Sequence, residues 1–374
     1  MNASAERNPS IRKLLRWGWV YFLYSTGLLA RARRRIAASC GIVVLTFHRV
    51  LGHAEFERTD SPSGMTVRSA TYERLLQHVA ANFDVVDLAE MPPNWNVKSS
   101  RPRLAITFDD GWKDTYDIAL PISRKYGVPI SIFVCPGLAG ISLPFWPERV
   151  TRAFRAAMHS PGVKKRLVEI CVEEQLPING SGAMLSRQCA DAVISALKGL
   201  ATKRRDEIVQ KFELAAEACN IPIAAMDAAM TWEETADAAE RGAQIGSHTQ
   251  THQILTTLDS PQAQAELADS KRAIENQLKR NCLCFAYPNG SWSPEVRDSV
   301  IRAGYSHAFL NEVGIWTQHS DSWLIPRVNV WEGTFEGPSG RFSRVAFEYA
   351  AFWRCYRAEA RKRKRMRRSP STKR

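Results

Sequence analysis

Two histidines and two adjacent aspartates are the residues of this sequence best suited to chemistry. Asp109 and Asp110 stand side by side, and His248 and His252 are four residues apart. That spacing places both imidazoles on one face of a helical turn, within reach of a single metal ion. Two imidazoles and one carboxylate leave an open position for water, and the second aspartate can act as a base on that water. Taken alone, each pair also has a structural explanation, as a helix cap or as buried core histidines.

All the candidate residues, including His48 and Tyr287, follow short apolar runs rich in β-branched residues. Such runs predict buried strands of a mainly parallel sheet. The predicted strands span residues 41–47, 83–87, 104–108, 129–134, 243–246, 283–286 and 327–330. In α/β barrels the carboxyl ends of the strands form one rim, where the active site lies. We therefore expect the candidate residues to meet at that rim.

Helical patterns alternate with these strands and predict an α/β fold, either a barrel or a doubly wound sheet. Thr231 and Glu234 form a capping-box pattern at the start of one predicted helix. Residues 145–230 are rich in helical patterns without a strand pattern, so we interpret them as an insertion. The predicted helices span residues 71–82, 112–126, 231–241, 261–279 and 294–303.

The composition is that of a globular protein, and its basic charge is concentrated at the two ends. Of 374 residues, 45% are hydrophobic, and the net charge is +13. Residues 1–40 carry +7 and residues 361–374 carry +9, so the rest carries −3. Nucleic-acid-binding domains carry their positive charge on a folded face, so we expect no nucleic-acid partner. Eight scattered cysteines without a CxxC motif predict free thiols in a reducing compartment.

The two ends also differ from the body in residue pattern. The apolar run at 17–30 has fourteen residues, fewer than the roughly 20 needed to span a bilayer, and lacks a clear signal-peptide cleavage site. Its aromatic residues and flanking arginines fit either a segment in a membrane interface or a helix packed on the domain. An aromatic helical pattern at 342–356 precedes residues 361–374, which we expect to be disordered because of their charge.

Three motifs resemble those of the polysaccharide deacetylases, the NodB-homology fold of carbohydrate esterase family 4. They are TFDDG at 107–111, SHTQTH at 247–252 and FAYPNG at 285–290. Four further segments resemble the branch that acts on exopolysaccharides such as poly-N-acetylglucosamine, namely LTFHRV at 45–50, TWEET at 231–235, AGYSHAF at 303–309 and PRVNV at 326–330. The resemblance covers about 41–135 and 231–330.

The resemblance implies a deformed (β/α) barrel with a helical insertion, and metal-dependent removal of N-acetyl groups from amino sugars. It assigns Asp110, His248 and His252 to a divalent metal, with zinc expected first and cobalt, nickel or iron as alternatives. Asp109 would be the general base. The backbone N–H of Tyr287 would help to stabilise the tetrahedral oxyanion.

The sequence departs from the family pattern at two points. Tyr287 stands where the third motif usually carries an arginine that holds the base; Arg327 is our candidate substitute, with a surface ion pair as the alternative. The late histidine that supplies the general acid is missing, since no histidine follows His319. In the branch with a histidine after its first strand, that role passes to His48. His307 is the other candidate, although its place within a strand favours packing.

We thus expect an N-terminal helical segment at 1–40, a catalytic domain at 41–340 and a C-terminal helix with a polybasic tail at 341–374. The expected substrate is an N-acetylated polysaccharide, oligosaccharide or lipid-linked glycan. The expected location is cytoplasmic, at the inner face of the membrane, with an anionic lipid surface as partner of the basic ends. Open alternatives are a deformylase of a lipid-linked amino sugar, a nodulation-type chito-oligosaccharide deacetylase, and an inactive glycan-binding protein.

Overall fold

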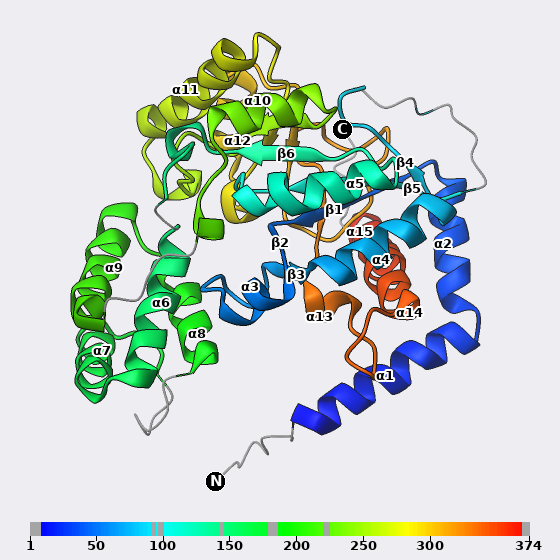
Figure 1. The fold of residues 1–374 in the computed structure, drawn as a ribbon. Coiled ribbons are helices and arrows are strands. Elements are labelled where there is room, and N and C mark those ends of the chain that lie inside the picture. Colours follow the sequence, from blue (N-terminus) through cyan, green and yellow to red (C-terminus); the bar gives the residue numbers. More distant parts are fainter. Residues whose placement is uncertain are drawn as a thin grey trace.

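A parallel β-sheet forms the centre of the computed structural model, which describes residues 9–90, 95, 101–142, 145–178, 186–219 and 225–368 (Figure 1). All its strand pairs are parallel, as predicted. Along the sheet the strands are β10 (Val328–Asn329), β1 (Ile42–Phe47), β5 (Arg103–Phe108), β6 (Ser131–Val134), β7 (Gln244–Ser247), β8 (Cys284–Ala286) and β9 (His307–Phe309), with β4 (Asp84–Val85) beside β5. Between β9 and the chain before β10, a single bridge joins Phe309 to Ile325. The sheet is therefore a curled, incompletely closed barrel, in agreement with the deformed barrel that the family resemblance implies.

Strand β1 shows how the sheet forms a core on both of its faces. All six of its residues are buried. Val43, Leu45 and Phe47 pack in the cluster that contains the surrounding helices. Ile42 and Val44 point the other way, into a second cluster inside the curled sheet. This alternation is why the strand is apolar throughout.

Five helices pack around the sheet where helical patterns were predicted. The predicted helix at 112–126 is shorter than expected, because it opens with a π-helical turn at Thr115–Ala119. Thr231 and Glu234 form the expected capping box at the start of α10. The helices are α4 (Ser69–Asn82), α5 (Leu120–Lys125), α10 (Trp232–Glu240), α11 (Ser260–Leu278) and α12 (Pro294–Arg302).

The insertion forms a separate group of helices with its own apolar core, at the lower left of Figure 1. It consists of α6 (Trp146–His159), α7 (Pro161–Glu173), α8 (Arg187–Leu197) and α9 (Thr202–Ala216), with short 3₁₀ turns at Glu217–Cys219 and Ala225–Asp227. Its described residues contain no strand, as predicted. Residues 179–185 and 220–224 of the predicted insertion lie outside the described part.

Several short elements of the structure were not predicted from the sequence. A two-stranded parallel sheet pairs β2 (Arg49–Leu51) with β3 (Thr66–Arg68). The chain between these two strands contains α3 (His53–Arg58). β2 and β3 each have three residues and include an arginine, so no continuous apolar run indicates them. Strand β9 was not among the predicted strand ranges, although His307 was expected to lie within a strand.

The two ends of the chain pack against each other. Helix α1 (Pro9–Ser25) leads into α2 (Leu28–Ala38), whose buried residues Leu29, Ala32 and Ile36 face a π-helical turn at Tyr349–Trp353. Short helices α13 (Glu332–Phe335) and α14 (Arg344–Glu348) precede that turn, and α15 (Arg354–Arg368) follows it. None of the described helices has the length and apolar character needed to cross a membrane.

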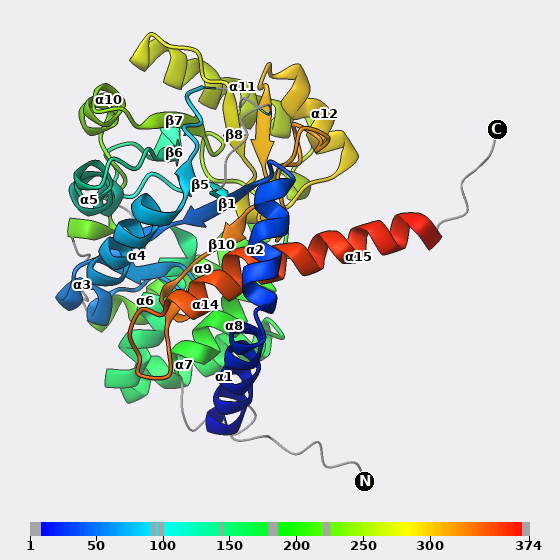
Figure 2. The ribbon, with the colours of Figure 1, turned by 90° about the vertical axis from the view of Figure 1, so that its right-hand side faces the viewer.

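The expectation of disorder from residue 361 onward is wrong for most of that segment. Helix α15 continues to Arg368 and projects from the body (Figure 2). Arginine and lysine are good helix formers, so a helix started by the buried turn before it extends through the basic residues. Residues 369–374 of the predicted tail lie outside the described residues.

Candidate metal and catalytic site

The predicted site residues meet at the carboxyl ends of neighbouring strands. His48 follows β1, Asp109 and Asp110 follow β5, and His248 follows β7. These strands lie close together in the sheet order, with only β6 between β5 and β7. The rim expected from the sequence is therefore present, on the side of the sheet toward which β6 points in Figure 1.

Asp110, His248 and His252 have the arrangement of a three-ligand metal site. Oδ1 of Asp110 lies 3.4 Å from Nε2 of His248 and 3.3 Å from Nε2 of His252. Ligands of a tetrahedral zinc ion lie about 2.0–2.2 Å from the metal, and hence about 3.3–3.5 Å from one another. Oδ1 is buried and has no hydrogen-bond partner among the described residues. The three residues therefore fit a divalent ion.

Hydrogen bonds hold two of these ligands in position. Nδ1 of His248 lies 2.7 Å from the carbonyl oxygen of Ala286, so it donates there and leaves the Nε2 lone pair facing the site. Oδ2 of Asp110 accepts a hydrogen bond from Nε1 of Trp112 at 2.9 Å. Phe145 packs against His252, with ring centroids 5.0 Å apart, and forms an apolar wall.

The two histidines do not lie on a helical turn, so the helical spacing predicted for them is wrong. They belong to a loop after β7 in which Thr249 has φ 68° and His252 has φ 62°. Asp110 also has a positive φ, 74°. Non-glycine residues avoid this region, and such strain is concentrated at functional sites. The loop thus brings together two imidazoles that a helix was expected to align.

Asp109 forms a buried, two-pronged ion pair with Arg327. Both guanidinium Nη atoms donate to the carboxylate oxygens at 2.7 Å, and Nε of Arg327 donates to the carbonyl of Leu310 at 2.8 Å. Arg327 is fully buried, so the alternative of a surface ion pair is wrong. Burial tends to raise the pKa of Asp109, but Arg327 and the nearby histidines outweigh it and lower that pKa. The structure therefore keeps Asp109 ionised and fixes its orientation.

The two other histidine candidates lie in different surroundings. His48 is half-buried at the rim, and its Nδ1 is buried without a hydrogen-bond partner. Burial lowers the pKa of His48, although Asp110 and Asp109 act in the opposite direction. His307 is the first residue of β9, at the opposite end of the strands, where its ring packs on Trp316. Packing is therefore the role of His307, as its position in the sequence favoured.

The role expected for the backbone of Tyr287 is wrong. Its N–H donates to the carbonyl of Phe309 at 3.0 Å, and its side chain is buried with the hydroxyl donating to Trp323. The N–H is therefore used by the sheet and cannot serve an oxyanion. Pro288 has no N–H, so the next one along the chain belongs to Asn289, at φ 58° in the following turn.

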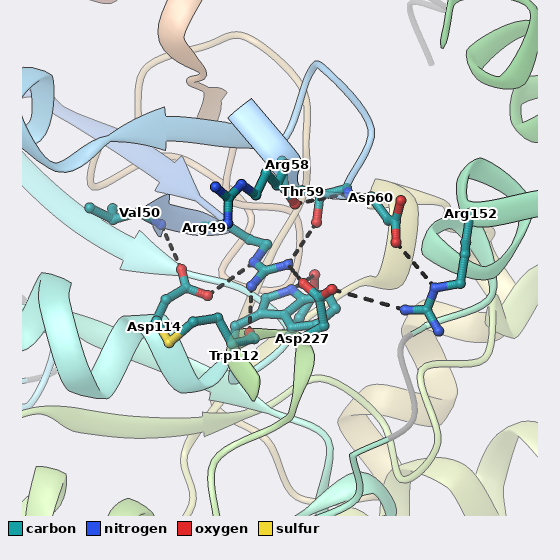
Figure 3. A network of polar contacts seen from close by, with 12 residues as sticks. Arg49, Val50, Arg58, Thr59, Asp60, Trp112, Asp114, Arg152 and Asp227 are labelled. Atoms are coloured by element: carbon teal, nitrogen blue, oxygen red, sulfur yellow. Dashed lines mark hydrogen bonds and ion pairs between the residues drawn. The ribbon is translucent and has the colours of Figure 1, made fainter. Parts of the chain in front are cut away.

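A buried polar network behind the metal site was not predicted from the sequence (Figure 3). Arg49 lies over the ring of Trp112, 4.2 Å from its centroid. Its Nε donates to Asp114 at 3.0 Å and its Nη1 to Asp227 at 2.5 Å. Trp112 donates a hydrogen bond to Asp110, a candidate metal ligand, so the contacts of Arg49 with Trp112 help to position that ligand. The arginine stands directly after His48 in the LTFHRV segment, which is the signal that could have indicated it.

The same network joins the helical insertion to the sheet. Arg152 of α6 donates to Asp60 at 3.1 Å and lies 4.0 Å from Asp227 (Figure 3). Glu148, one turn earlier in α6, is fully buried, and neither of its carboxylate oxygens has a hydrogen-bond partner. Burial is the main cause that raises the pKa of Glu148, to about 8. The junction between insertion and barrel therefore contains a carboxyl group that is protonated at neutral pH.

Comparison with known proteins agrees with the resemblance found in the motifs. Residues 96–163 and 201–308, somewhat under half of the chain, match the model of the polysaccharide deacetylase family. The chain is also similar to YxkH of Bacillus subtilis (strain 168), whose name places it among polysaccharide deacetylases. The two are 30% identical over 104 residues, which is 28% of this chain and 37% of YxkH.

Two solved structures share the fold. The Streptococcus pyogenes deacetylase PplD, in complex with acetate, has a TM-score of 0.50 at 17% identity, covering 79% of this chain and 94% of PplD. BA0330 from Bacillus anthracis has a TM-score of 0.51 at 13% identity. The match covers 83% of this chain and 69% of the BA0330 chain. At these identities the likeness shows the fold alone.

Proposed function

We propose that this chain, which carries a polysaccharide deacetylase domain at residues 96–163 and 201–308, removes N-acetyl groups from the amino sugars of a glycan by metal-dependent hydrolysis. The observation that carries this proposal is the cluster of Asp110, His248 and His252 beside a carboxylate, Asp109, that is held by Arg327. These groups are the ones that hydrolysis of an unactivated amide requires.

Asp110, His248 and His252 would hold the divalent ion, with zinc as the ion that this donor set suits best. Such an ion supplies two effects when bound: it lowers the pKa of water, and it polarises the carbonyl of the acetamido group. The hydrogen bonds from Trp112 to Asp110 and from His248 to Ala286 keep the ligands oriented for this task.

Asp109 accepts the proton of the attacking water. Its carboxylate needs to be ionised and aimed at the site, and the two bonds from Arg327 support both conditions. As the amide carbon becomes tetrahedral, negative charge develops on its oxygen and requires donors. We assign the N–H of Asn289 to this role, because that of Tyr287 is already used within the sheet.

His48 donates a proton to the leaving nitrogen, which departs poorly as an anion. Its place at the end of β1, directly after the strand that pairs with the strand before Asp109 and Asp110, supports this assignment. Burial of its Nδ1 leaves the other ring nitrogen, Nε2, to face the substrate.

Acetate release from N-acetylglucosamine oligomers tests the proposal. The purified full-length chain is stripped with a chelator and then reconstituted with zinc or cobalt, and acetate is measured before and after. We expect the metal to restore release. Formate release from an N-formyl sugar without acetate release would instead favour a deformylase. If the chain bound no divalent metal at all, the catalytic assignment would be wrong.

A further inference from the structure

Helix α1 presents an apolar face to solvent. Six of its large apolar residues are between 43% and 70% exposed: Leu14, Leu15, Trp19, Tyr21, Phe22 and Tyr24. Surface helices of globular proteins normally carry charged residues on their outer face. Between Leu14 and Ser25 the only charged residue is Arg16, and its guanidinium donates to the carbonyl of Gly333. The outward face of α1 in this stretch therefore has no charge.

The helix is nonetheless fixed to the protein. Val20 and Leu23 on its inner side are buried, and α1 packs against α2 and α14. Both views place α1 at the lower edge of the molecule, with its outer side turned away from the sheet (Figures 1 and 2). The exposed aromatic residues thus lie on a helix that is packed against the body. An exposed apolar patch of this kind indicates a surface that contacts a protein or a membrane.

Basic residues of α2, the helix that packs against α1, indicate what would cover this patch. Arg31 and Arg34 of α2 are exposed and form no ion pair with the described residues. A separate group of exposed basic residues lies on α15, which projects from the body away from α1 (Figure 2): Arg354, Arg357, Arg361, Lys362 and Lys364. The α1 helix of a second copy would bring no negative charge to the arginines of α2, because α1 contains no acidic residue. An anionic lipid surface would neutralise them while it buried the aromatic rings.

We propose that the outer face of α1 docks onto an anionic lipid bilayer, with its aromatic side chains at the level of the headgroups and with the arginines of α2 contacting lipid phosphates. Tryptophan and tyrosine suit this position because each has an apolar ring and a polar atom. The helix lies in the interface and does not cross the bilayer. This inference does not depend on the catalytic proposal.

The test measures binding of the full-length chain to vesicles of phosphatidylcholine with 30 mol% phosphatidylglycerol, by co-sedimentation. Trp19→Ser with Phe22→Ser removes two exposed rings of α1. The control, Val172→Ser with Leu214→Ser, removes two apolar side chains that are 65% and 64% exposed on the insertion. We expect the α1 variant to bind at least tenfold more weakly than wild type, and the control to bind as wild type does. Acetate release from soluble oligomers should be the same in all three proteins.

Equal binding of the α1 variant and wild type would overturn the proposal, as would a wild-type chain that does not bind these vesicles. Light scattering without lipid tests the other occupant. If wild type is a dimer and the α1 variant a monomer, the face is an interface between copies, and the membrane proposal is wrong. Should the variant fail to fold, brominated phosphatidylcholine in the vesicles must still quench tryptophan fluorescence of wild type. Absence of quenching would likewise overturn the proposal.

Discussion

At the scale of single residues, the candidate site divides the work between two adjacent carboxylates. Asp110 faces the imidazoles of His248 and His252, whereas Asp109 faces Arg327. The change of direction between the two aspartates coincides with the positive φ of Asp110. Their neighbours thus assign one carboxylate to a metal and keep the other as a free, ionised base.

Asp109→Asn should lower kcat by at least the roughly 10²–10⁴-fold that a general base contributes, while the metal stays bound. The amide keeps the shape of the side chain but cannot take a proton. Metal content by mass spectrometry, measured beside acetate release, checks both halves. Asp110→Asn is the matched control and should lose the metal. Loss of metal from the Asp109 variant, with retention in the control, would mean that the two roles are reversed.

Trp112→Phe should weaken metal binding by about 10–100-fold, the usual effect of removing a partner that orients a ligand. Phenylalanine keeps an aromatic ring beneath Arg49 but lacks the N–H that donates to Asp110. Titration of the chelator-treated chain with zinc, against a competing indicator, measures the affinity. An unchanged affinity would show that Asp110 is held by its backbone alone.

At the scale of helices and strands, the sequence predicted the central strands and the rim that they form, because buried parallel strands are continuous apolar runs. Arg327 was a candidate partner for Asp109 because the family's usual arginine is missing from the third motif, and the structure shows the two side chains paired. The loop of His248 and His252 could not be predicted, because its positive φ values depend on tertiary contacts. The sheet hydrogen bond of Tyr287 likewise depends on β9, a strand of three residues.

The junction between the insertion and the barrel predicts a specific pH dependence. The pKa of Glu148 is about 8 in the folded chain and 4.5 without burial. Between these values the unfolded chain has lost a proton that the folded chain retains. Folding is therefore penalised increasingly as pH rises from about 4.5 to 8, by up to about 1.4 kcal/mol per pH unit, and the penalty is constant above that range.

Glu148→Gln should remove this penalty, because the amide has a similar volume and does not ionise. We expect the variant to have a higher free energy of unfolding than wild type at pH 9, with the difference shrinking toward pH 5. Urea unfolding of both proteins at pH 5, 7 and 9 measures it. The other buried carboxyls are common to both proteins and cancel in the comparison. A difference that did not vary with pH would mean that Glu148 does not titrate in this range.

At the scale of the whole molecule, the positive charge is concentrated in the two terminal segments, residues 1–40 and 361–374, outside the barrel. The last buried residue of α15 among those described is Cys355, so the basic part of that helix contributes to no core. Net charge of +9 on residues 361–374 contrasts with −3 on the body between the two ends. Composition predicted this separation. It did not predict that α15 would hold part of the charge on a helix projecting from the body (Figure 2).

Deleting residues 361–374 should weaken binding to anionic vesicles and reduce its dependence on salt. Each lysine or arginine near such a surface contributes about 1 kcal/mol at low ionic strength, and salt screens this attraction. We expect at least tenfold weaker binding at low salt and little difference from wild type at high salt, where the apolar face of α1 still contacts lipid. Replacing the nine basic residues of the segment with glutamine keeps its length and should act like the deletion. If the strength and salt dependence of vesicle binding were unchanged, residues 361–374 would have no part in it. The electrostatic attraction would then come from the arginines of α2 alone.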